Sequence, residues 1–381
     1  MKLEFCLWDD ENNLVGVNDS VFALARKRDR LLLSLYLESA SATVFSSNSH
    51  VNLEQIREAI DTIHQRVSGA DAPACPINSR IAATVLDWSE SRARPSPQRY
   101  FWRTMESQLL QTGEFQTHLT TDGGGEAVVF IHGSGPGANG LSNWRLILPV
   151  VAKTHLVLVP DLIGYGQSSH PSPAPQGTRA WMRLWINQIL SLIDNLGLER
   201  VHLVGNSLGG AICLHLLTEA PERFGKVVLM GSSGAPFTLT PELDRLWGFY
   251  GDPGLAPMEN AIRAFTYDET FIADRLEEIT KTRFEAAMQP GVGESFASMW
   301  SRPRQHNIDS MRVPDSALLR IKNPTLLIHG INDRVVPYST SLYLAERLHD
   351  ARVHLLGRCG HWTQIEHSEV FHKLVGDFLG A

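Results

Sequence analysis

The serine at position 207 stands in a context that is typical of a catalytic nucleophile. It is the centre of Gly205-Asn206-Ser207-Leu208-Gly209, which follows the apolar segment VHLV and precedes the helical segment GGAICLHLL. In such a strand-to-helix turn the glycines on either side of the serine keep side chains away from a crowded backbone, and the hydroxyl is exposed. An ordinary turn serine is the alternative, because a chain with 30 glycines can match so short a pattern by chance. The neighbouring strand and helix favour the nucleophile.

Two further residues complete the set that a nucleophilic serine needs. Its hydroxyl is a weak nucleophile at neutral pH and requires a histidine to accept the proton and an acid to orient that histidine. Asp333 follows the segment PTLLIHG, and His361 follows the segment ARVHLL. Each alone could be a solvated turn aspartate or a hydrogen-bonded structural histidine. The order serine, aspartate, histidine, each beyond the carboxyl end of a predicted strand, is that of the α/β hydrolases and predicts a triad. Asp161, in PDLIGYGQSS, is interpreted as a structural turn residue.

A glycine-rich segment, HGSGPGA at 132–138, follows the apolar segment AVVFI. Glycines let backbone N–H groups converge, and an acyl-transfer enzyme needs two such donors where the oxyanion develops. We expect one N–H from this loop and the other from Leu208, the residue after the nucleophile. A phosphate-binding loop is the alternative, but GSGPGA fits neither GxGxxG nor GxxxxGK.

The elements that must position these residues follow an α/β pattern. From about residue 127 onward, short apolar strands alternate with helical segments, which predicts a mostly parallel sheet with helices on both faces. The interval 235–320 contains helical segments at 257–267 and 269–288 but no convincing strand, and is interpreted as a helical lid. The predicted strands are 127–131, 155–159, 201–204, 227–230, 324–328 and 351–355.

Residues 1–112 differ from the rest of the chain. They open with a possible strand at 2–7, continue with helical stretches and Ser-rich turns, and contain no catalytic motif. The clearest helix begins at Asn52, where Gln55 completes a capping box and an apolar stripe follows. We therefore expect an N-terminal extension domain over 1–112 and a catalytic domain over 113–381 that includes the lid.

Composition excludes several classes of protein. The net charge of -7, from 34 basic and 41 acidic residues, is mild and well mixed, so a nucleic-acid partner is not expected. The start MKLEFCLWDDENN and the short apolar run at 31–37 fit neither a secretory signal nor the roughly 20 residues of a membrane span, and favour a soluble cytoplasmic protein. The four cysteines lie far apart, without the paired spacing of a zinc site, and are expected to be reduced. They are Cys6, Cys75, Cys213 and Cys359.

Residues from about 113 to 381 resemble the meta-cleavage product hydrolases, a branch of the α/β-hydrolase superfamily that breaks carbon-carbon bonds. The resemblance is carried by HGSGPGANGLSNW (132–144), GNSLGG (205–210), TRFEAAM (282–288) and CGHWTQIEH (359–367). Members hydrolyse 2-hydroxy-6-oxohexa-2,4-dienoates, formed by extradiol cleavage of catechols, into 2-hydroxypenta-2,4-dienoate and a carboxylic acid. The resemblance thus implies an enzyme of aromatic catabolism with a small-molecule substrate, no metal and no organic cofactor.

The resemblance also implies how the substrate is bound. Arg283 and Asn143 match residues that bind the dienoate end. An arginine fork can satisfy a carboxylate by paired charge-assisted hydrogen bonds, and an amide can add a neutral contact to the neighbouring oxygen. The alternatives are a surface position on an amphipathic lid helix for Arg283 and a helix cap for Asn143.

The remaining matched positions lie next to the catalytic residues. Trp362 matches the aromatic residue beside the catalytic histidine, and Asn206 matches the residue before the nucleophile. The resemblance implies that both are substrate-binding positions, and the alternative is that both are purely structural. The catalytic set that the resemblance implies is the triad Ser207, Asp333 and His361 with an oxyanion hole formed by the N–H groups of Ser134 and Leu208.

The family's usual members are close to the length of the C-terminal part alone, so residues 1–112 receive no assignment. We interpret them as an oligomerisation or lid-supporting domain and expect a homo-oligomer. A carboxylesterase or related acyl hydrolase with the same triad is the alternative activity, and it would not require Arg283 or Asn143. A non-catalytic binding protein on this scaffold is disfavoured by the complete triad. The substituent on the substrate, and the choice between an acyl-enzyme and an activated water, stay open.

Overall fold

The computed structural model describes residues 105–380 together with the backbone of six short strands between residues 3 and 42. The chain divides into two compact units, Met1–Tyr100 and Phe101–Ala381. In the first unit β4 and β5 form an antiparallel pair, in which Phe22 lies opposite Leu35 and Lys27 opposite Arg30. The strands of this unit are β1 (Leu3–Glu4), β2 (Leu7–Trp8), β3 (Leu14–Val15), β4 (Phe22–Lys27), β5 (Arg30–Leu37) and β6 (Ala40–Ala42).

This hairpin differs from the helical stretches expected after the first strand. The segment RLLLSLYL of β5 is a nearly continuous apolar run, and such a run is compatible with a strand or with a buried helix. The possible strand at 2–7 overlaps β1 and the start of β2. The helix expected from Asn52 lies outside the described residues.

The second unit is built on an eight-stranded sheet in the order β14-β13-β12-β11-β9-β10-β8-β7. Neighbouring strands from β10 to β14 are parallel, whereas β8 is antiparallel to both β10 and β7. The mostly parallel sheet and all six predicted strands are confirmed, within one to three residues at their ends. The strands are β7 (Glu106–Thr112), β8 (Phe115–Asp122), β9 (Ala127–Ile131), β10 (Leu156–Pro160), β11 (Val201–Asn206), β12 (Phe224–Met230), β13 (Thr325–Gly330) and β14 (Ala351–Leu356).

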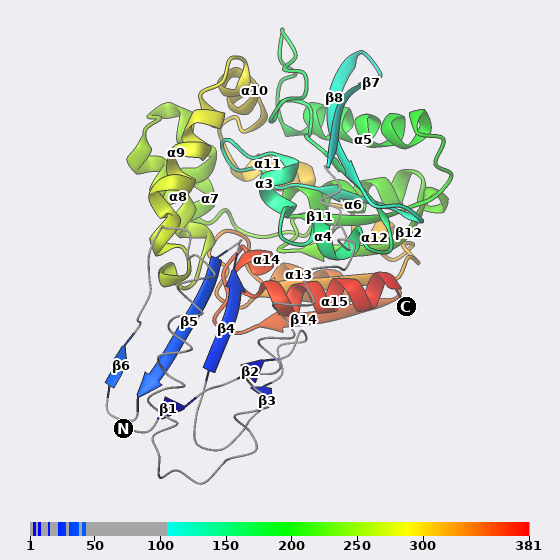
Figure 1. The fold of residues 1–381 in the computed structure, drawn as a ribbon. Helices are drawn as coiled ribbons and strands as arrows, with labels where there is room; N and C mark the ends of the chain where they lie inside the picture. The colour runs from blue at the N-terminus through cyan, green and yellow to red at the C-terminus, as the bar shows by residue number, and fades with distance from the viewer. Residues whose placement is uncertain are drawn as a thin grey trace, which may run out of the picture. The chain divides into compact units, whose positions relative to one another are not determined.

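Both faces of the sheet are covered, as Figure 1 shows. Alternate residues of β9 face opposite ways: Val128 and Phe130 belong to the core beneath α3, α4 and α15, and Val129 and Ile131 to the core beneath α5 and α6. This burial on both sides explains why the strands read as continuous apolar runs. The helices are α3 (Gly140–Trp144), α4 (Leu148–Val151), α5 (Thr178–Asn195), α6 (Leu208–Glu219), α13 (Ser339–Ala345), α14 (Thr363–Glu366) and α15 (Ser368–Gly380).

The interval between β12 and β13 is helical and contains no strand within the described residues 235–320, so the predicted lid is confirmed. Four of its helices, α7 to α10, gather to one side of the sheet in Figure 1. The segment 269–288 opens with two 3-10 turns, and its α-helix begins only at Leu276. The lid helices are α7 (Pro241–Trp247), α8 (Leu255–Phe265), α9 (Leu276–Ala287), α10 (Val292–Met299), α11 (Gln305–Met311) and α12 (Asp315–Leu318).

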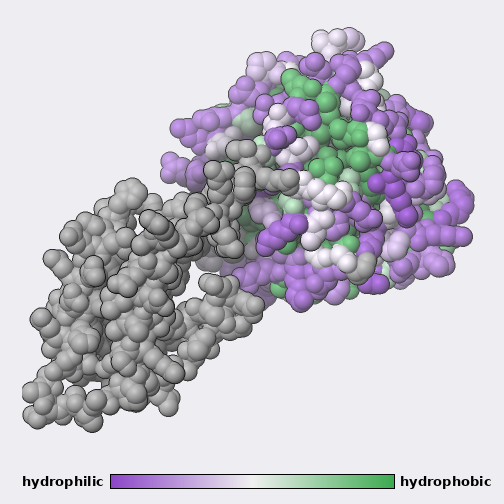
Figure 2. Space-filling view, turned by 45° about the vertical axis from the view of Figure 1, so that its right-hand side comes forward, coloured by the Kyte–Doolittle hydropathy of each residue, from purple (hydrophilic) through white to green (hydrophobic). Residues whose placement is uncertain are grey.

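The visible surface of the second unit is mainly hydrophilic, with hydrophobic residues gathered in one region of the face in Figure 2. No helix in the described part of the chain is long and apolar enough to cross a membrane. Cys213 and Cys359 are buried free thiols.

Candidate active site

Ser207 occupies the sharp turn between β11 and α6. Its φ of 53° and ψ of -112° are unusual for a residue with a side chain, and such strain is kept where the surrounding structure requires it. The N–H of Ser207 donates to the Met230 carbonyl at 2.9 Å. Although Ser207 is the N-cap of α6, its side chain makes no capping hydrogen bond. A Cβ on Gly209 would overlap the Ile131 carbonyl, so the glycine is needed for the close approach of backbone that sets this turn.

His361 and Asp333 form a short buried pair. His361 Nδ1 lies 2.6 Å from Asp333 Oδ2, and the carboxylate is fully buried. The two loops meet because they follow the parallel neighbours β14 and β13. Since Nδ1 donates to the carboxylate, Nε2 of the neutral ring is left to act as the base.

The surroundings of Asp333 keep it ionised. Its Oδ1 accepts the N–H groups of Val335 and Val336 at 2.8 and 2.9 Å. Burial by itself raises the pKa of Asp333, but the charge of His361 and the hydrogen bonds from His329 and His361 outweigh it and hold that pKa below its usual value. The carboxylate is therefore charged before any substrate binds.

Gly231 lies between the turn that holds Ser207 and the His361–Asp333 pair. It follows Met230, whose carbonyl accepts the Ser207 N–H, and a Cβ on Gly231 would lie 3.1 Å from the His361 ring and 3.5 Å from Asp333 Oδ2. Ser207, Asp333 and His361 thus lie in the turns that follow β11, β13 and β14, at the carboxyl ends of parallel strands of one sheet.

The glycine-rich loop is held in place by His132, which the sequence reasoning had not assigned. His132 is buried, its Nδ1 contacts the Gly133 carbonyl at 2.8 Å, and its Nε2 accepts the Leu162 N–H at 3.0 Å. The ring is therefore a neutral Nδ1–H tautomer. Burial lowers the pKa of His132, with Arg283 contributing in the same direction and Asp161 opposing.

The loop passes directly beside the nucleophile. A Cβ on Gly133 would lie 2.5 Å from Asn206 Oδ1 and 3.3 Å from Ser207 Cβ. In the described loops around the site, the N–H groups of Ser134 and Leu208 are not used by backbone hydrogen bonds. Ser134 Oγ accepts the indole N–H of Trp247, a lid residue, at 3.3 Å. Two donors are thus available beside Ser207, as an oxyanion hole requires.

Arg283 extends from α9 to this loop. Its Nε donates to the Pro136 carbonyl at 2.9 Å, and its guanidinium lies 5.6 and 5.7 Å from the ring centres of Phe265 and Trp362. No carboxylate of the described residues pairs with it. Burial lowers the pKa of Arg283 to about 10, so it remains charged at neutral pH. A partly buried cation without a carboxylate partner among the described residues is a place for an anion.

Asn143 lies inside α3, and the cap of that helix is Asn139, whose side chain accepts the Ser142 N–H at 2.7 Å. The capping alternative for Asn143 is therefore wrong. Asn143 Oδ1 accepts the Gly133 N–H at 3.3 Å, but its Nδ2 is buried without a hydrogen-bond partner. A buried donor left unpaired is costly, which points to an acceptor supplied by a ligand.

Trp362 and Asn206 lie next to His361 and Ser207 in the chain and pack near them. Asn206 is buried, and its amide faces Gly133 and the Met230 sulfur. Trp362 stacks on Phe265 at 4.8 Å between ring centres, and Phe265 also stacks on His361 at 5.7 Å. Sequence reasoning missed Phe265, because an aromatic residue in a lid helix carries no local signal of its role.

A metal is not supported by the donors of the described residues. Glu126, His155 and His202 are the one group there with three potential ligand atoms within 4.8 Å of one another. His202 Nδ1, however, lies 2.9 Å from the Lys226 N–H and must accept it. The proton of the neutral ring is then on Nε2, which faces Glu126 and cannot ligate a metal.

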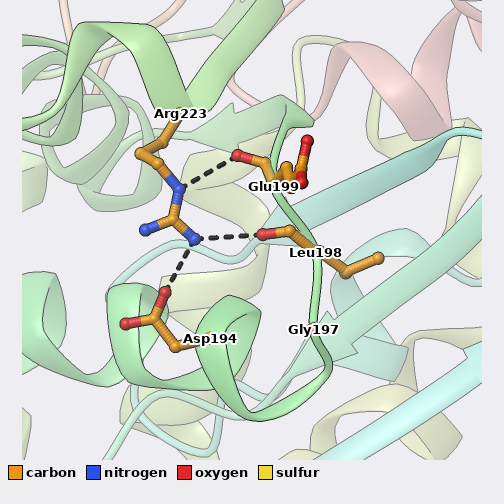
Figure 3. Close-up of a pocket in the computed structure, with 5 residues that line it drawn as sticks. All are labelled: Asp194, Gly197, Leu198, Glu199 and Arg223. Atoms are coloured by element: carbon orange, nitrogen blue, oxygen red, sulfur yellow. Dashed lines mark hydrogen bonds and ion pairs between the residues drawn. The ribbon is translucent and has the colours of Figure 1, made fainter.

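A surface hollow of about 340 Å³ lies at the connection between α5 and β11, away from Ser207 (Figure 3). Arg223 there donates to Asp194 Oδ1 at 2.7 Å and to the carbonyls of Leu198 and Glu199 at 3.0 Å each. Its hydrogen bonds tie this connection together, so we interpret the hollow as structural.

Comparisons with known proteins extend these observations. The family model for the alpha/beta hydrolase fold matches residues 126–368. The chain is 41% identical over 264 residues to 2-hydroxymuconate semialdehyde hydrolase of Pseudomonas sp. strain CF600, covering 69% of this chain and 90% of the relative. It is 38% identical over 273 residues to 2-hydroxy-6-oxo-2,4-heptadienoate hydrolase of Pseudomonas putida strain F1, covering 72% and 96%.

Solved structures give the same relationship. The 2-hydroxy-6-oxo-6-phenylhexa-2,4-dienoate hydrolase of Rhodococcus sp. strain RHA1 is 42% identical, with a TM-score of 0.68 over 73% of this chain and 99% of that one. A meta-cleavage product hydrolase of Pseudomonas fluorescens IP01 is 38% identical, with a TM-score of 0.68 over 72% and 97%.

Proposed function

This chain belongs to the meta-cleavage product hydrolases of the α/β-hydrolase superfamily, and we propose that Ser207, His361 and Asp333 are its catalytic triad. It hydrolyses a carbon-carbon bond in 2-hydroxy-6-oxohexa-2,4-dienoate-type ring-cleavage products, giving 2-hydroxypenta-2,4-dienoate and a carboxylic acid. The observation that carries the site assignment is the partly buried Arg283 beside the glycine-rich loop, which has no carboxylate partner among the described residues, because it explains how an anionic dienoate is recognised.

In the proposed reaction the C6 carbonyl carbon is attacked and the bond to the dienoate fragment breaks. His361 Nε2 takes a proton from the nucleophile, which is Ser207 Oγ or a water activated in its place. The N–H groups of Ser134 and Leu208 stabilise the oxyanion. The electron pair of the broken bond goes to the departing carbon, which receives a proton, and water supplies the hydroxyl of the acid.

We further propose that Arg283 and Asn143 bind the carboxylate and the neighbouring oxygen of the dienoate. The Arg283 Nη groups have no carboxylate partner among the described residues, and the Asn143 Nδ2 is buried and unpaired. Together they offer charged and neutral donors to two adjacent oxygens. Trp362 is proposed to support the site by packing against Phe265, which stacks on His361, and Asn206 by packing against the glycine-rich loop at Gly133.

The alternative, a carboxylesterase with the same triad, leaves the unpaired Arg283 without a purpose. The deciding experiment adds purified protein to a panel of yellow dienoate ring-cleavage products, follows the loss of absorbance and identifies the products. We expect 2-hydroxypenta-2,4-dienoate and a carboxylic acid in equal amounts. Hydrolysis of p-nitrophenyl esters together with stable dienoates would contradict the proposal.

Residues 1–100, which make up most of the segment 1–112 expected from the sequence, are proposed to form an extension that acts in assembly of a homo-oligomer. The division of the chain into two compact units and the location of every proposed site residue in the second unit support this. We propose that the enzyme works in the cytoplasm, where free thiols such as Cys213 and Cys359 stay reduced.

A further inference from the structure

Asp333 is contacted by a second histidine, His329, which lies on β13. Both side chains are fully buried, and His329 Nε2 is 3.1 Å from Asp333 Oδ2, the oxygen that His361 also contacts. The same Nε2 is 2.9 Å from the Val336 carbonyl, and Nδ1 is 2.7 Å from Ser341 Oγ. Every polar atom of the ring is thus engaged.

These contacts determine the tautomer of His329. A carbonyl oxygen and a carboxylate oxygen can only accept, so Nε2 must carry a hydrogen that both share. Nδ1 of the neutral ring then accepts the Ser341 hydroxyl. Ser341 is itself buried on α13 and so fixes the ring from the opposite side.

Asp333 consequently accepts four N–H groups: two from the backbone at Oδ1 and two from imidazoles at Oδ2. The carboxylate cannot rotate without breaking some of these bonds, and Oδ2 divides its charge between two donors. We propose that His329 is a positioning residue for the reaction, acting on His361 through the shared Oδ2 of Asp333. This inference rests on the proposed triad.

Two imidazoles face the Asp333 carboxylate. His329 comes from β13 and His361 from the loop after β14. Cys359 on that loop is a neutral thiol, since burial first, and then the charges of Glu366 and Asp333, raise its pKa. The neighbouring Arg334 directs its guanidinium to the carbonyls of Arg263 and Thr266. His329 is therefore the group able to compete with His361 for Oδ2.

Loss of the His329 N–H has two consequences. The full charge of Oδ2 then acts on His361, so the protonated ring is stabilised and the base loses its proton only at higher pH. The carboxylate is also freer to rotate, which disturbs the orientation of His361. Substrate binding should change little, because His329 is buried behind Asp333.

The test uses the full-length enzyme and measures kcat and KM for a dienoate from about pH 5 to 9. His329→Leu removes the donor, whereas His329→Gln keeps an N–H that can reach Oδ2. We expect His329→Leu to lower kcat about tenfold or more and to leave KM within about twofold of wild type. The acid limb of the pH profile, where kcat/KM falls at low pH, should move up by about half a pH unit or more. His329→Gln should retain most of kcat and the wild-type limb. The control is His354→Leu on the exposed edge strand β14, opposite Ile328.

If His329→Leu does not fold, two milder substitutions of serines on α13 test the proposal. Ser341→Ala frees Nδ1 of His329, and Ser339→Ala changes an exposed serine on the same helix. We expect the low-field proton signal of the His361–Asp333 bond, and the acid limb, to shift in Ser341→Ala and not in Ser339→Ala.

Three results would overturn the inference: an unshifted limb in His329→Leu, equal losses in the Leu and Gln variants, or an unmoved proton signal in Ser341→Ala. Ser207→Ala, assayed in parallel, separates this failure from failure of the triad. If Ser207→Ala stays active, the triad is wrong; if it is inactive while the limb does not move, only the role of His329 is wrong.

Discussion

At the scale of single residues, the two charged groups Asp333 and Arg283 of the site have opposite surroundings. Asp333 accepts four N–H groups, while Arg283 has one carbonyl partner and no carboxylate within the described chain. The difference suits their proposed tasks. The acid must be ionised and fixed before substrate arrives, whereas the arginine receives its counterion only from the substrate.

Arg283→Gln should therefore impair the enzyme selectively. The dienoate carboxylate would be left desolvated without its charged partner. The fall in kcat/KM for C-C hydrolysis should correspond to about 2–4 kcal/mol of lost transition-state stabilisation. Cleavage of a neutral p-nitrophenyl ester should change much less. Steady-state kinetics on both substrates check this, and equal losses would mean that Arg283 supports the loop only through Pro136.

His132 predicts how stability depends on pH. Burial lowers its pKa in the folded state, so below about pH 6.5 the unfolded chain binds a proton that the folded chain does not. The stability that neutral His132 contributes is thus complete above that pH. It is lost as the pH falls toward the pKa of His132 in the folded state. Urea titrations of wild type and His132→Gln at several pH values measure this. As pH falls, the free energy of unfolding should decrease more steeply in wild type than in the variant, by up to about 1.4 kcal/mol per pH unit. Parallel curves would contradict this.

The sequence predicted those site residues that lie in recognisable segments, and missed those defined by contacts between distant segments. Ser207, Asp333 and His361 could be identified from their order after predicted strands. The unpaired Nδ2 of Asn143 and the stacking of Phe265 on His361 depend on tertiary packing. His329 lies in the segment PTLLIHG, four residues before Asp333 in the chain. Its contact with the Asp333 carboxylate depends on the turn after β13, which the sequence pattern does not define.

At the scale of elements, the lid is bound to the segment that carries His361. Phe265, at the end of α8, accepts the N–H groups of His361 and Trp362 with its carbonyl at 2.8 and 3.1 Å. Glu366 accepts N–H groups from Tyr267 in the lid and from Gly360 beside His361, both at 2.7 Å. A displacement of α8 would therefore be transmitted to the base.

The tight packing of α6 against β9 gives a prediction with a matched control. Gly209 is in the first turn of α6, where a Cβ would overlap the Ile131 carbonyl, whereas a Cβ on Gly376 in α15 meets nothing within 4 Å. Gly209→Ala should cost about 3 kcal/mol of unfolding free energy, and Gly376→Ala should add about 0.5–1 kcal/mol. Chemical denaturation measures both. Similar small effects would show that the elbow tolerates a side chain.

The buried parallel strands could be predicted because each is a short, nearly continuous apolar run between loops. The hairpin of β7 and β8 could not, since ESQLLQT and FQTHLTTD mix polar and apolar residues at an edge of the sheet where only part of each strand is buried. The polar composition that hid β7 is what an edge strand requires in water.

At the scale of the whole molecule, the catalytic unit begins before residue 113, the start expected from the sequence. Residues of β7 pair with β8 from Glu106 opposite Thr121 to Thr112 opposite Phe115. Removing β7 would leave the backbone of β8 without a partner along that edge. The hydrolase unit is thus best taken from Phe101, in agreement with the division of the chain.

A chain starting at Phe101 should keep dienoate turnover, and one starting at Gly113 should melt about 5 °C or more lower and aggregate more readily. Size-exclusion chromatography of the form that starts at Phe101 should show a change of oligomeric size relative to the full chain if residues 1–100 act in assembly. Activity assays, thermal melts and fluorophosphonate labelling of Ser207 check these points. A form starting at Phe101 that is well folded yet inert would mean that the extension contributes to the active site.

The central claim, that a triad built on Ser207 performs C-C hydrolysis, is tested most directly by mixing Ser207→Ala with a dienoate in a stopped-flow spectrometer. Alanine keeps the turn but removes the hydroxyl, so the dienoate spectrum should shift on binding and then persist, with kcat lower by about a thousandfold or more. A variant that binds the dienoate and still retains more than about a tenth of wild-type kcat would contradict the claim.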